Sequence, residues 1–447
     1  MGGGRYPDGV ATHPATQEDL ATFVQAREQI AAFDAPILVD GGRTQDRLFI
    51  AAFDGTGNSV HKDAPENLTN VARIREQVEA LHKRGEASQI ATGYVEGPGT
   101  QTGLPGVVDA MGGGTYEARM EEMYLQFTHK AAAWLKENPG ADIRIAAIGF
   151  SRGAEQAAGF TRLVEERGIQ DPVGMQVVRD ARGFIERLEF TRPPLREPGT
   201  VIQAVGLFDP VGTGEPRNHD RRLPPSVVSG FQITAEDERR NLFQSTRVLD
   251  PGVTDGGRFL NVTVAGAHSD IGGSYTLDGL SIRSGNLMID YLNALSDPPF
   301  LQKREEPTDP ARNVIHRSED HQFFYRTSVY DKEGIRGRQE ELAPSNLCRI
   351  DCLDAQPRNA AMAEGLRWRP VEIGPTPVAA SPASMVEPLL QAAKQGDGTA
   401  IDRIGREHLH SEQGQAWLQA GQHRLREAEP IVHAPVEPQR EPAALAR

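Results

Sequence analysis

The sequence predicts an α/β protein built on a mostly parallel, doubly wound sheet. Between residues 47 and 295, short apolar runs typical of buried strands alternate with segments whose apolar residues recur at helical spacing. The strand patterns end in turns rich in glycine or in polar residues. With 447 residues, of which 38% are hydrophobic and 25% charged, the chain can bury a sizeable core.

The predicted elements follow one another in strand and helix order. The first strand is expected at 47–53, before the glycine-rich turn 54–58, and a helix follows between Asn67 and Gly85. Further strands are expected at 90–95, 143–150, 201–208 and 259–265, and further helices at 116–135, 154–164 and 287–295.

Charge and missing motifs exclude several classes of function. The 48 basic and 62 acidic residues give a formal charge of −14, which disfavours non-specific binding of nucleic acid. No apolar run reaches the roughly 18 residues of a membrane span, and the N-terminus lacks an apolar signal core, so synthesis in the cytoplasm without a signal peptide is expected. Because no metal or nucleotide motif is complete, neither cofactor nor metal is predicted. The pairs 221–222 and 239–240, both Arg-Arg, are expected to be solvated.

One motif points to nucleophilic catalysis. Residues 149–153, Gly-Phe-Ser-Arg-Gly, match G-x-S-x-G where a buried strand meets a helix of small residues. That setting is the nucleophile elbow of an α/β-hydrolase, with Ser151 as the nucleophile. Gly149 and Gly153 stand where a Cβ would clash in such a turn. A tight turn without chemistry is the alternative.

A serine nucleophile needs a histidine base and a carboxylate that orients it. In α/β-hydrolases the chain order is Ser, acid, His. Asp209 and His268 follow two predicted strands in that order, at the carboxyl edge of the sheet where ligands bind. Asp270 is expected to bond nearby backbone N–H groups instead. The alternatives left open are Asp250 as the acid, and His316 or His321 as the base.

The oxyanion formed during acyl transfer requires two backbone donors. One is expected from Arg152, the residue after the nucleophile. The other is expected from Gly55 or Thr56 in the turn that begins at Asp54, because glycine lets backbone N–H groups come close. An ordinary turn is the alternative for 54–58.

Seven sequence blocks together resemble the α/β-hydrolase domain of bacterial type VI secretion phospholipase effectors, the Tle class. The blocks are 53–58, 67–71, 94–100, 149–154, 208–212, 237–240 and 266–273. The resemblance implies a phospholipase A-type ester hydrolase with a Ser-His-Asp triad. It further implies a membrane phospholipid substrate, secretion into the periplasm of a target cell as an antibacterial toxin, and two partners, a cognate immunity protein and a component of the secretion apparatus.

Two other functions remain open at this point, a cytoplasmic serine esterase for a soluble ester and a non-catalytic binding module on a hydrolase fold. The predicted organisation is an N-terminal arm at 1–45 and an α/β-hydrolase catalytic domain at 46–300. An associated region of unassigned fold follows at 301–374. A linker and a C-terminal helical extension with a tail are expected at 375–447.

Overall fold

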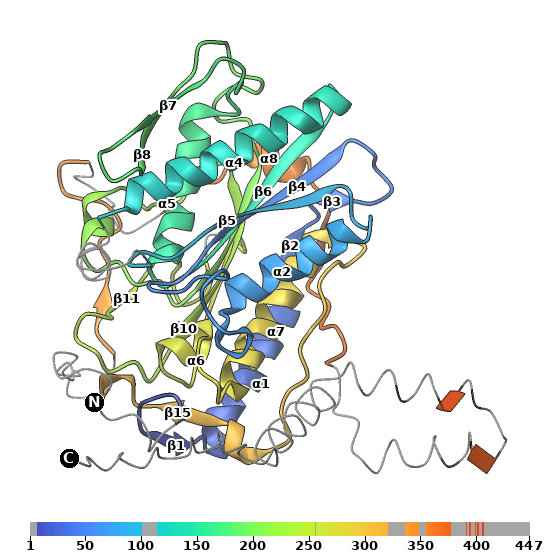
Figure 1. Cartoon of the computed structure of the whole chain (residues 1–447), viewed down its shortest axis with the longest axis vertical. Coiled ribbons are helices and arrows are strands. Elements are labelled where there is room, and N and C mark those ends of the chain that lie inside the picture. Colours follow the sequence, from blue (N-terminus) through green and yellow to red (C-terminus); the bar gives the residue numbers. More distant parts are fainter. Residues whose placement is uncertain are drawn as a thin grey trace, which may run out of the picture. The chain divides into compact units, whose positions relative to one another are not determined.

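The computed structural model describes residues 7–100, 114–254, 256–320, 336–347 and 355–376, with isolated positions between 390 and 405. The chain divides into two units, Met1–Val378 and Ala379–Arg447. All structure discussed below belongs to the first unit (Figure 1). Most of the predicted linker and C-terminal extension, and the candidate base His321, lie outside the described residues.

A seven-stranded sheet forms the centre of the first unit. Its order is β12-β13-β10-β9-β6-β4-β5, and every pairing is parallel except that of β12 with β13. The strands are β4 (Asp46–Phe53), β5 (Ile90–Val95), β6 (Asp142–Phe150), β9 (Gln203–Phe208), β10 (Val227–Ala235), β12 (Gly252–Thr254) and β13 (Phe259–Val264). The prediction of a mostly parallel α/β sheet is confirmed. Strand β10 was not predicted, because its serine and glycine interrupt the apolar run.

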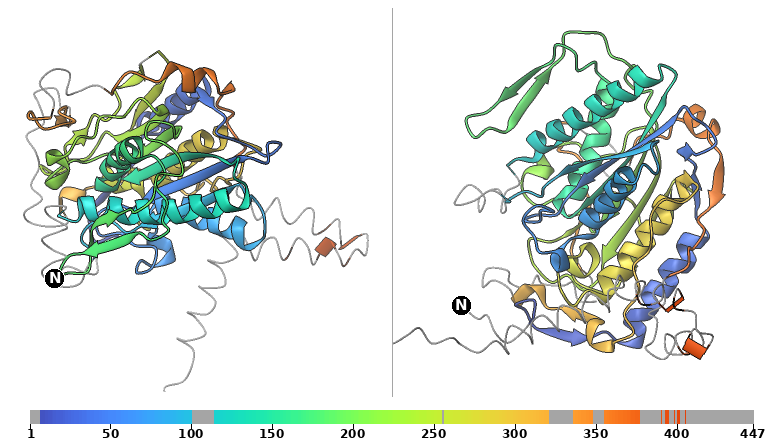
Figure 2. Two further views of the ribbon diagram at one scale, coloured as in Figure 1. Left: turned by 90° about the horizontal axis from the view of Figure 1, so that it is seen from above. Right: turned by 45° about the vertical axis from the view of Figure 1, so that its right-hand side comes forward.

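Helices cover both faces of this sheet. Figures 1 and 2 show α4 and α5 on one face and α1, α2 and α7 on the other. The five helices are α1 (Gln17–Ala31), α2 (Asn70–Lys83), α4 (Tyr116–Glu137), α5 (Arg152–Arg167) and α7 (Gly279–Ala294). Side chains of β4 alternate between the two layers: Leu48 and Ile50 pack toward α1, α2 and α7, whereas Phe49 and Phe53 pack toward α4 and α5. The sheet is therefore doubly wound.

The winding reverses beside β4, which pairs with β5 on one side and with β6 on the other. In open α/β sheets such a reversal leaves a crevice at the carboxyl ends of the strands, because the two connections leave in opposite directions. The turn after β4 and the start of α5 after β6 lie at this point.

In the described part of the chain, five two-stranded pairings lie outside the central sheet, and four of them involve the segments before and after the predicted domain. Strand β16 (Arg338–Gln339) pairs with β11 (Ser245–Thr246), so part of the unassigned region 301–374 pairs with a segment of the predicted domain. The other pairs are β1 (Thr12–Pro14) with β15 (Val314–His316), β2 (Asp34–Pro36) with β17 (Trp368–Pro370), β3 (Val39–Asp40) with β14 (Ser296–Asp297), and β7 (Gln176–Arg179) with β8 (Ile185–Glu189).

The remaining elements are short. They are α6 (His268–Gly272), α8 (Ala360–Glu364), and the 3-10 helices η1 (Pro65–Asn67), η2 (Glu215–Asn218), η3 (Pro310–Arg312) and η4 (Ser318–Asp320). Within the described ranges, no helix combines the length and the apolar character that crossing a bilayer requires.

Candidate active site

Ser151 lies in a strained turn between β6 and α5. Its backbone has φ 60° and ψ −127°, a conformation that residues with a Cβ rarely adopt. The two flanking glycines are required by close approach. A Cβ on Gly149 would lie 2.2 Å from the carbonyl oxygen of Gly153, and one on Gly153 would lie 2.4 Å from those of Phe53 and Asp54. This is the geometry of a nucleophile elbow.

The predicted acid and base lie together at the carboxyl ends of two strands. Asp209 directly follows β9, and His268 opens α6 just after β13. Although 59 residues separate them in sequence, Nδ1 of His268 lies 2.6 Å from Oδ2 of Asp209. Both side chains are buried.

Asp209 is held by two further groups besides His268. The backbone N–H of Ala235, the last residue of β10, donates to Oδ1 at 3.0 Å. The guanidinium of Arg336 donates from Nη1 to Oδ1 at 2.7 Å and from Nη2 to Oδ2 at 3.0 Å. Burial raises the pKa of Asp209, but Arg336 and His268 outweigh it and hold that pKa at about 2. The carboxylate is therefore ionised at neutral pH.

The sequence does not single out Arg336 as a functional residue. Arg336 lies 127 positions after Asp209, in the region whose fold was not assigned, and no motif surrounds it. Its guanidinium also donates to the carbonyl oxygens of Ala235 at 2.8 Å and of Phe243 at 2.6 and 3.0 Å. Only the tertiary structure brings these groups together.

Two aromatic rings pack against the His268 imidazole, and a second carboxylate accepts a hydrogen bond from the His268 backbone. The ring centroids of Phe150 and Phe243 lie 4.5 and 5.1 Å from it. The backbone N–H of His268 donates to Oε2 of Glu238 at 3.2 Å. Burial lowers the pKa of His268 more than the bond to Asp209 raises it. The imidazole is thereby kept neutral, as a general base requires.

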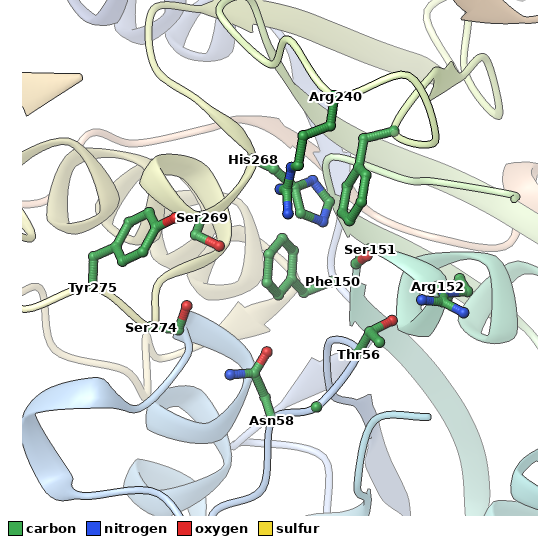
Figure 3. Close-up of a pocket in the computed structure, with 12 residues that line it drawn as sticks. Thr56, Asn58, Phe150, Ser151, Arg152, Arg240, His268, Ser269, Ser274 and Tyr275 are labelled. Atoms are coloured by element: carbon green, nitrogen blue, oxygen red, sulfur yellow. The ribbon is translucent and has the colours of Figure 1, made fainter. Parts of the chain in front are cut away.

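Ser151 and His268 both line one cavity of about 300 Å³, and Figure 3 shows their side chains facing it. Among the described residues, the lining consists of Thr56, Gly57, Asn58, Phe150, Ser151, Arg152, Arg240, Phe243, His268, Ser269, Ser274 and Tyr275.

Of the three residues predicted to supply oxyanion donors, Thr56 and Arg152 line the cavity and Gly55 does not. The N–H of Gly55 donates to Oδ1 of Asp54 at 2.8 Å, so it is directed away from the cavity. Thr56 lines the cavity, and its hydroxyl is buried with no hydrogen-bond partner among the described residues. Arg152 is the first residue of α5, where backbone N–H groups point outward and favour negative charge.

Asp54 does not line the cavity. It links the end of β4 to β5 and to the start of α2. Its carboxylate accepts hydrogen bonds from the Tyr94 hydroxyl of β5 at 2.5 Å and from the Thr69 hydroxyl that precedes α2 at 2.7 Å. Burial raises the pKa of Asp54 to about 6, against the lowering effect of these bonds. Its contacts fix the shape of the 54–58 turn.

The alternative acid and base residues have other partners. His316 bonds through Nδ1 to Asp270 at 2.6 Å and through Nε2 to Asp8 at 3.0 Å, and it does not line the cavity. Besides His316, Asp270 accepts a bond from the backbone N–H of Ala267. Asp250 forms an ion pair with a neighbouring arginine in the loop before β12.

The expectation that both arginine pairs are solvated is wrong for one member of each. Arg221 is fully buried against Glu155, with the two side chains 2.9 Å apart. Arg240 lines the cavity, bonds Glu238 at 2.9 Å, and lies over the Phe243 ring at 3.5 Å. Each guanidinium is balanced by a buried carboxylate, which is 66 positions away for Arg221 and two positions away for Arg240.

Comparisons with known proteins identify the family. Residues 47–300 match the model of the type VI secretion (T6SS) phospholipase effector Tle1-like catalytic domain, which confirms the resemblance seen in the sequence. No curated protein matches the sequence.

Similar solved structures include an uncharacterised protein from Pseudomonas aeruginosa, with 18% identity, a TM-score of 0.40, and coverage of 71% of this chain and 54% of the other. A Tle1 effector solved bound to the VgrG spike of the type 6 secretion system has 21% identity, a TM-score of 0.32, and 51% coverage of each chain. Esterase 2 of Thermogutta terrifontis has 14% identity, a TM-score of 0.28, and coverage of 64% and 95%. The chain therefore spans about half the length of the first two of these proteins.

Proposed function

The chain belongs to the family of Tle1-like type VI secretion phospholipase effectors, and on this premise we propose that it cleaves a fatty acyl ester of a glycerophospholipid by a phospholipase A-type reaction. We assign the catalysis to Ser151, His268 and Asp209. The observation that carries the proposal is the bonded His268–Asp209 pair beside a serine in an elbow conformation, with Ser151 and His268 lining one cavity.

The geometry supports a definite role for each side chain. Because Asp209 is ionised, it accepts a hydrogen bond from Nδ1–H of His268, so the lone pair on Nε2 is free to act as the base. Nε2 takes the proton of Ser151 as Oγ attacks the acyl carbonyl, and later gives it to the leaving lysophospholipid alcohol. Water then hydrolyses the acyl-enzyme with the same base.

We assign the oxyanion to the loop after β4 and the start of α5. Arg152 and Thr56 both line the cavity, and Arg152 is the first residue of α5, whereas the backbone N–H of Gly55 is directed to Asp54. A hydroxyl that is buried without a partner is costly, so the Thr56 hydroxyl would be satisfied by an oxyanion in the cavity.

The test is incubation of the purified protein with vesicles of phosphatidylethanolamine and phosphatidylglycerol, with mass spectrometry of the products. Free fatty acid and lysophospholipid are expected from the wild type, and neither from Ser151→Ala. Hydrolysis of soluble esters alone would favour the soluble esterase. Failure of Ser151 to react with a fluorophosphonate probe would favour the binding module.

We further propose that the protein acts as an antibacterial toxin in the periplasm of a target cell. Family membership and the association of a Tle1 effector with a VgrG spike support export by a type VI secretion system through contact with such a component. A cognate immunity protein would protect the producer. Fusion to a periplasmic export signal is expected to stop growth of Escherichia coli, whereas the Ser151→Ala fusion is expected to be harmless; equal growth of both would contradict the toxin role.

A further inference from the structure

We propose that Arg336 is a positioning residue of the active site, which fixes the Asp209 carboxylate in the orientation that His268 requires. This inference rests on the proposed function of Ser151, His268 and Asp209. It extends the active site beyond residues 47–300, to which the family's catalytic domain corresponds.

The contact has the geometry of a specific arginine–carboxylate pair. Two nitrogens of the Arg336 guanidinium donate to the two oxygens of Asp209 at 2.7 and 3.0 Å. Such paired bonds fix the plane of a carboxylate, which a single point charge does not. The Arg336 side chain is 7% exposed and that of Asp209 is fully buried, so solvent screens the pair little.

The remaining bonds of Arg336 hold it in that position. Its guanidinium donates to the backbone carbonyls of Ala235 and Phe243, and β16 begins two residues later and pairs with β11. The same oxygen of Asp209, Oδ2, accepts from Arg336 Nη2 and from His268 Nδ1. Rotation of the carboxylate therefore breaks both bonds together, and Arg336 opposes that rotation.

Arg336 also sets the charge around the imidazole. Among the described residues, the charged groups that act on His268 include the carboxylates of Asp209 and Glu238 and the guanidinium of Arg240. Asp209 is paired with Arg336, and Glu238 is paired with Arg240. Removing Arg336 leaves Asp209 unbalanced beside the ring. The excess negative charge would favour the imidazolium and keep the base protonated up to a higher pH.

The test compares Arg336→Gln and Arg336→Lys with wild type by the pH dependence of 4-nitrophenyl butyrate hydrolysis. For Arg336→Gln we expect kcat to fall about 10²-fold, the loss typical of a misplaced catalytic group, with little change in KM because Arg336 does not line the cavity. The acidic limb of the profile should move to higher pH. Arg336→Lys keeps the charge, so the acidic limb should stay in place. It loses the paired bonds to Asp209, so kcat should fall.

Arg258→Gln is the matched control. Arg258 is also a buried arginine, but it bonds the backbone carbonyls of Val227, Pro224 and Gln356 and precedes β13 at the end opposite His268. We expect its replacement to lower thermal stability without moving the acidic limb. In a protein that already carries Asp209→Asn, Arg336→Gln should lower kcat much less, because the carboxylate that Arg336 positions is no longer present.

Each outcome is decisive. A wild type that neither hydrolyses the ester nor labels at Ser151 overturns the proposed function and this inference with it. If the wild type is active, an Arg336→Gln protein with an unchanged limb and kcat overturns the inference alone. Should Arg336→Gln fail to fold, Arg336→Lys decides: kcat equal to wild type overturns the inference, and a reduced kcat with an unmoved limb supports it.

Discussion

Replacing Ser151 by glycine is expected to give a more stable protein than replacing it by alanine, although both variants lose the nucleophile. At φ 60° and ψ −127° a residue with a Cβ costs about 1–3 kcal/mol, and glycine avoids this cost. Glycine loses about 0.5–1 kcal/mol more conformational free energy on folding than alanine. The difference predicts that Ser151→Gly exceeds Ser151→Ala in free energy of unfolding by about 1 kcal/mol.

Urea unfolding followed by tryptophan fluorescence and circular dichroism measures this difference. The matched control is Ala157→Gly, the same alanine-to-glycine change inside helix α5 at a fully buried site. There glycine should lower the free energy of unfolding by about 1 kcal/mol or more, because the helix gains nothing from its backbone freedom. If Ser151→Gly proves no more stable than Ser151→Ala, the elbow does not store the strain inferred from its backbone angles.

Three further predictions concern the acid, the elbow and a second histidine. Asp209→Asn should lower kcat on soluble esters about 10⁴-fold, because an asparagine amide favours the wrong tautomer of His268. The circular dichroism spectrum should be unchanged, and nearly wild-type kinetics would exclude Asp209 as the acid. Gly153→Ala places a Cβ 2.4 Å from two backbone carbonyl oxygens. We expect the free energy of unfolding, measured by thermal unfolding, to fall by about 3 kcal/mol, or the protein not to fold. Wild-type stability would contradict the close approach. For His316, burial lowers the pKa but two carboxylates outweigh it and raise it from 6.5 to about 9. The stabilisation from charged His316 should be complete below about pH 6.5 and should be lost as pH rises through about 9. The difference in free energy of unfolding between wild type and His316→Gln should therefore become smaller over that interval. A difference that does not change with pH would refute the charged state of His316.

Much of the fold was predictable because its signals are local. Strands β4 and β6 carry continuous apolar runs, β13 has apolar residues on both sides of Asn261 and Thr263, and α2 and α4 have apolar residues at helical spacing. Helix α7 begins at Gly279, eight residues before the predicted start, because small and polar residues in its first half hide the apolar period. Residues such as Gly285, whose Cβ would lie 2.6 Å from Asn70, are small because helices approach closely there.

The candidate site was predictable where a backbone requirement marks the sequence. Gly149 and Gly153 flank Ser151 because no Cβ fits, and that requirement is visible as a motif. Asp209 and His268 were found because each follows a strand, and parallel strands end at one edge. The direction of the Gly55 N–H toward Asp54 depends on side-chain contacts and could not be read from the residue order.

By itself the sequence determined the type and order of the main elements, the doubly wound sheet, the family and the candidate nucleophile, since periodicity and close backbone approach leave local traces. Only the tertiary structure decided which charges neutralise one another. Arg336 reaches Asp209, and Arg221 reaches Glu155, across 127 and 66 positions. Ion pairing depends on distance in space and on exclusion of water, and neither quantity is encoded in any short stretch of sequence.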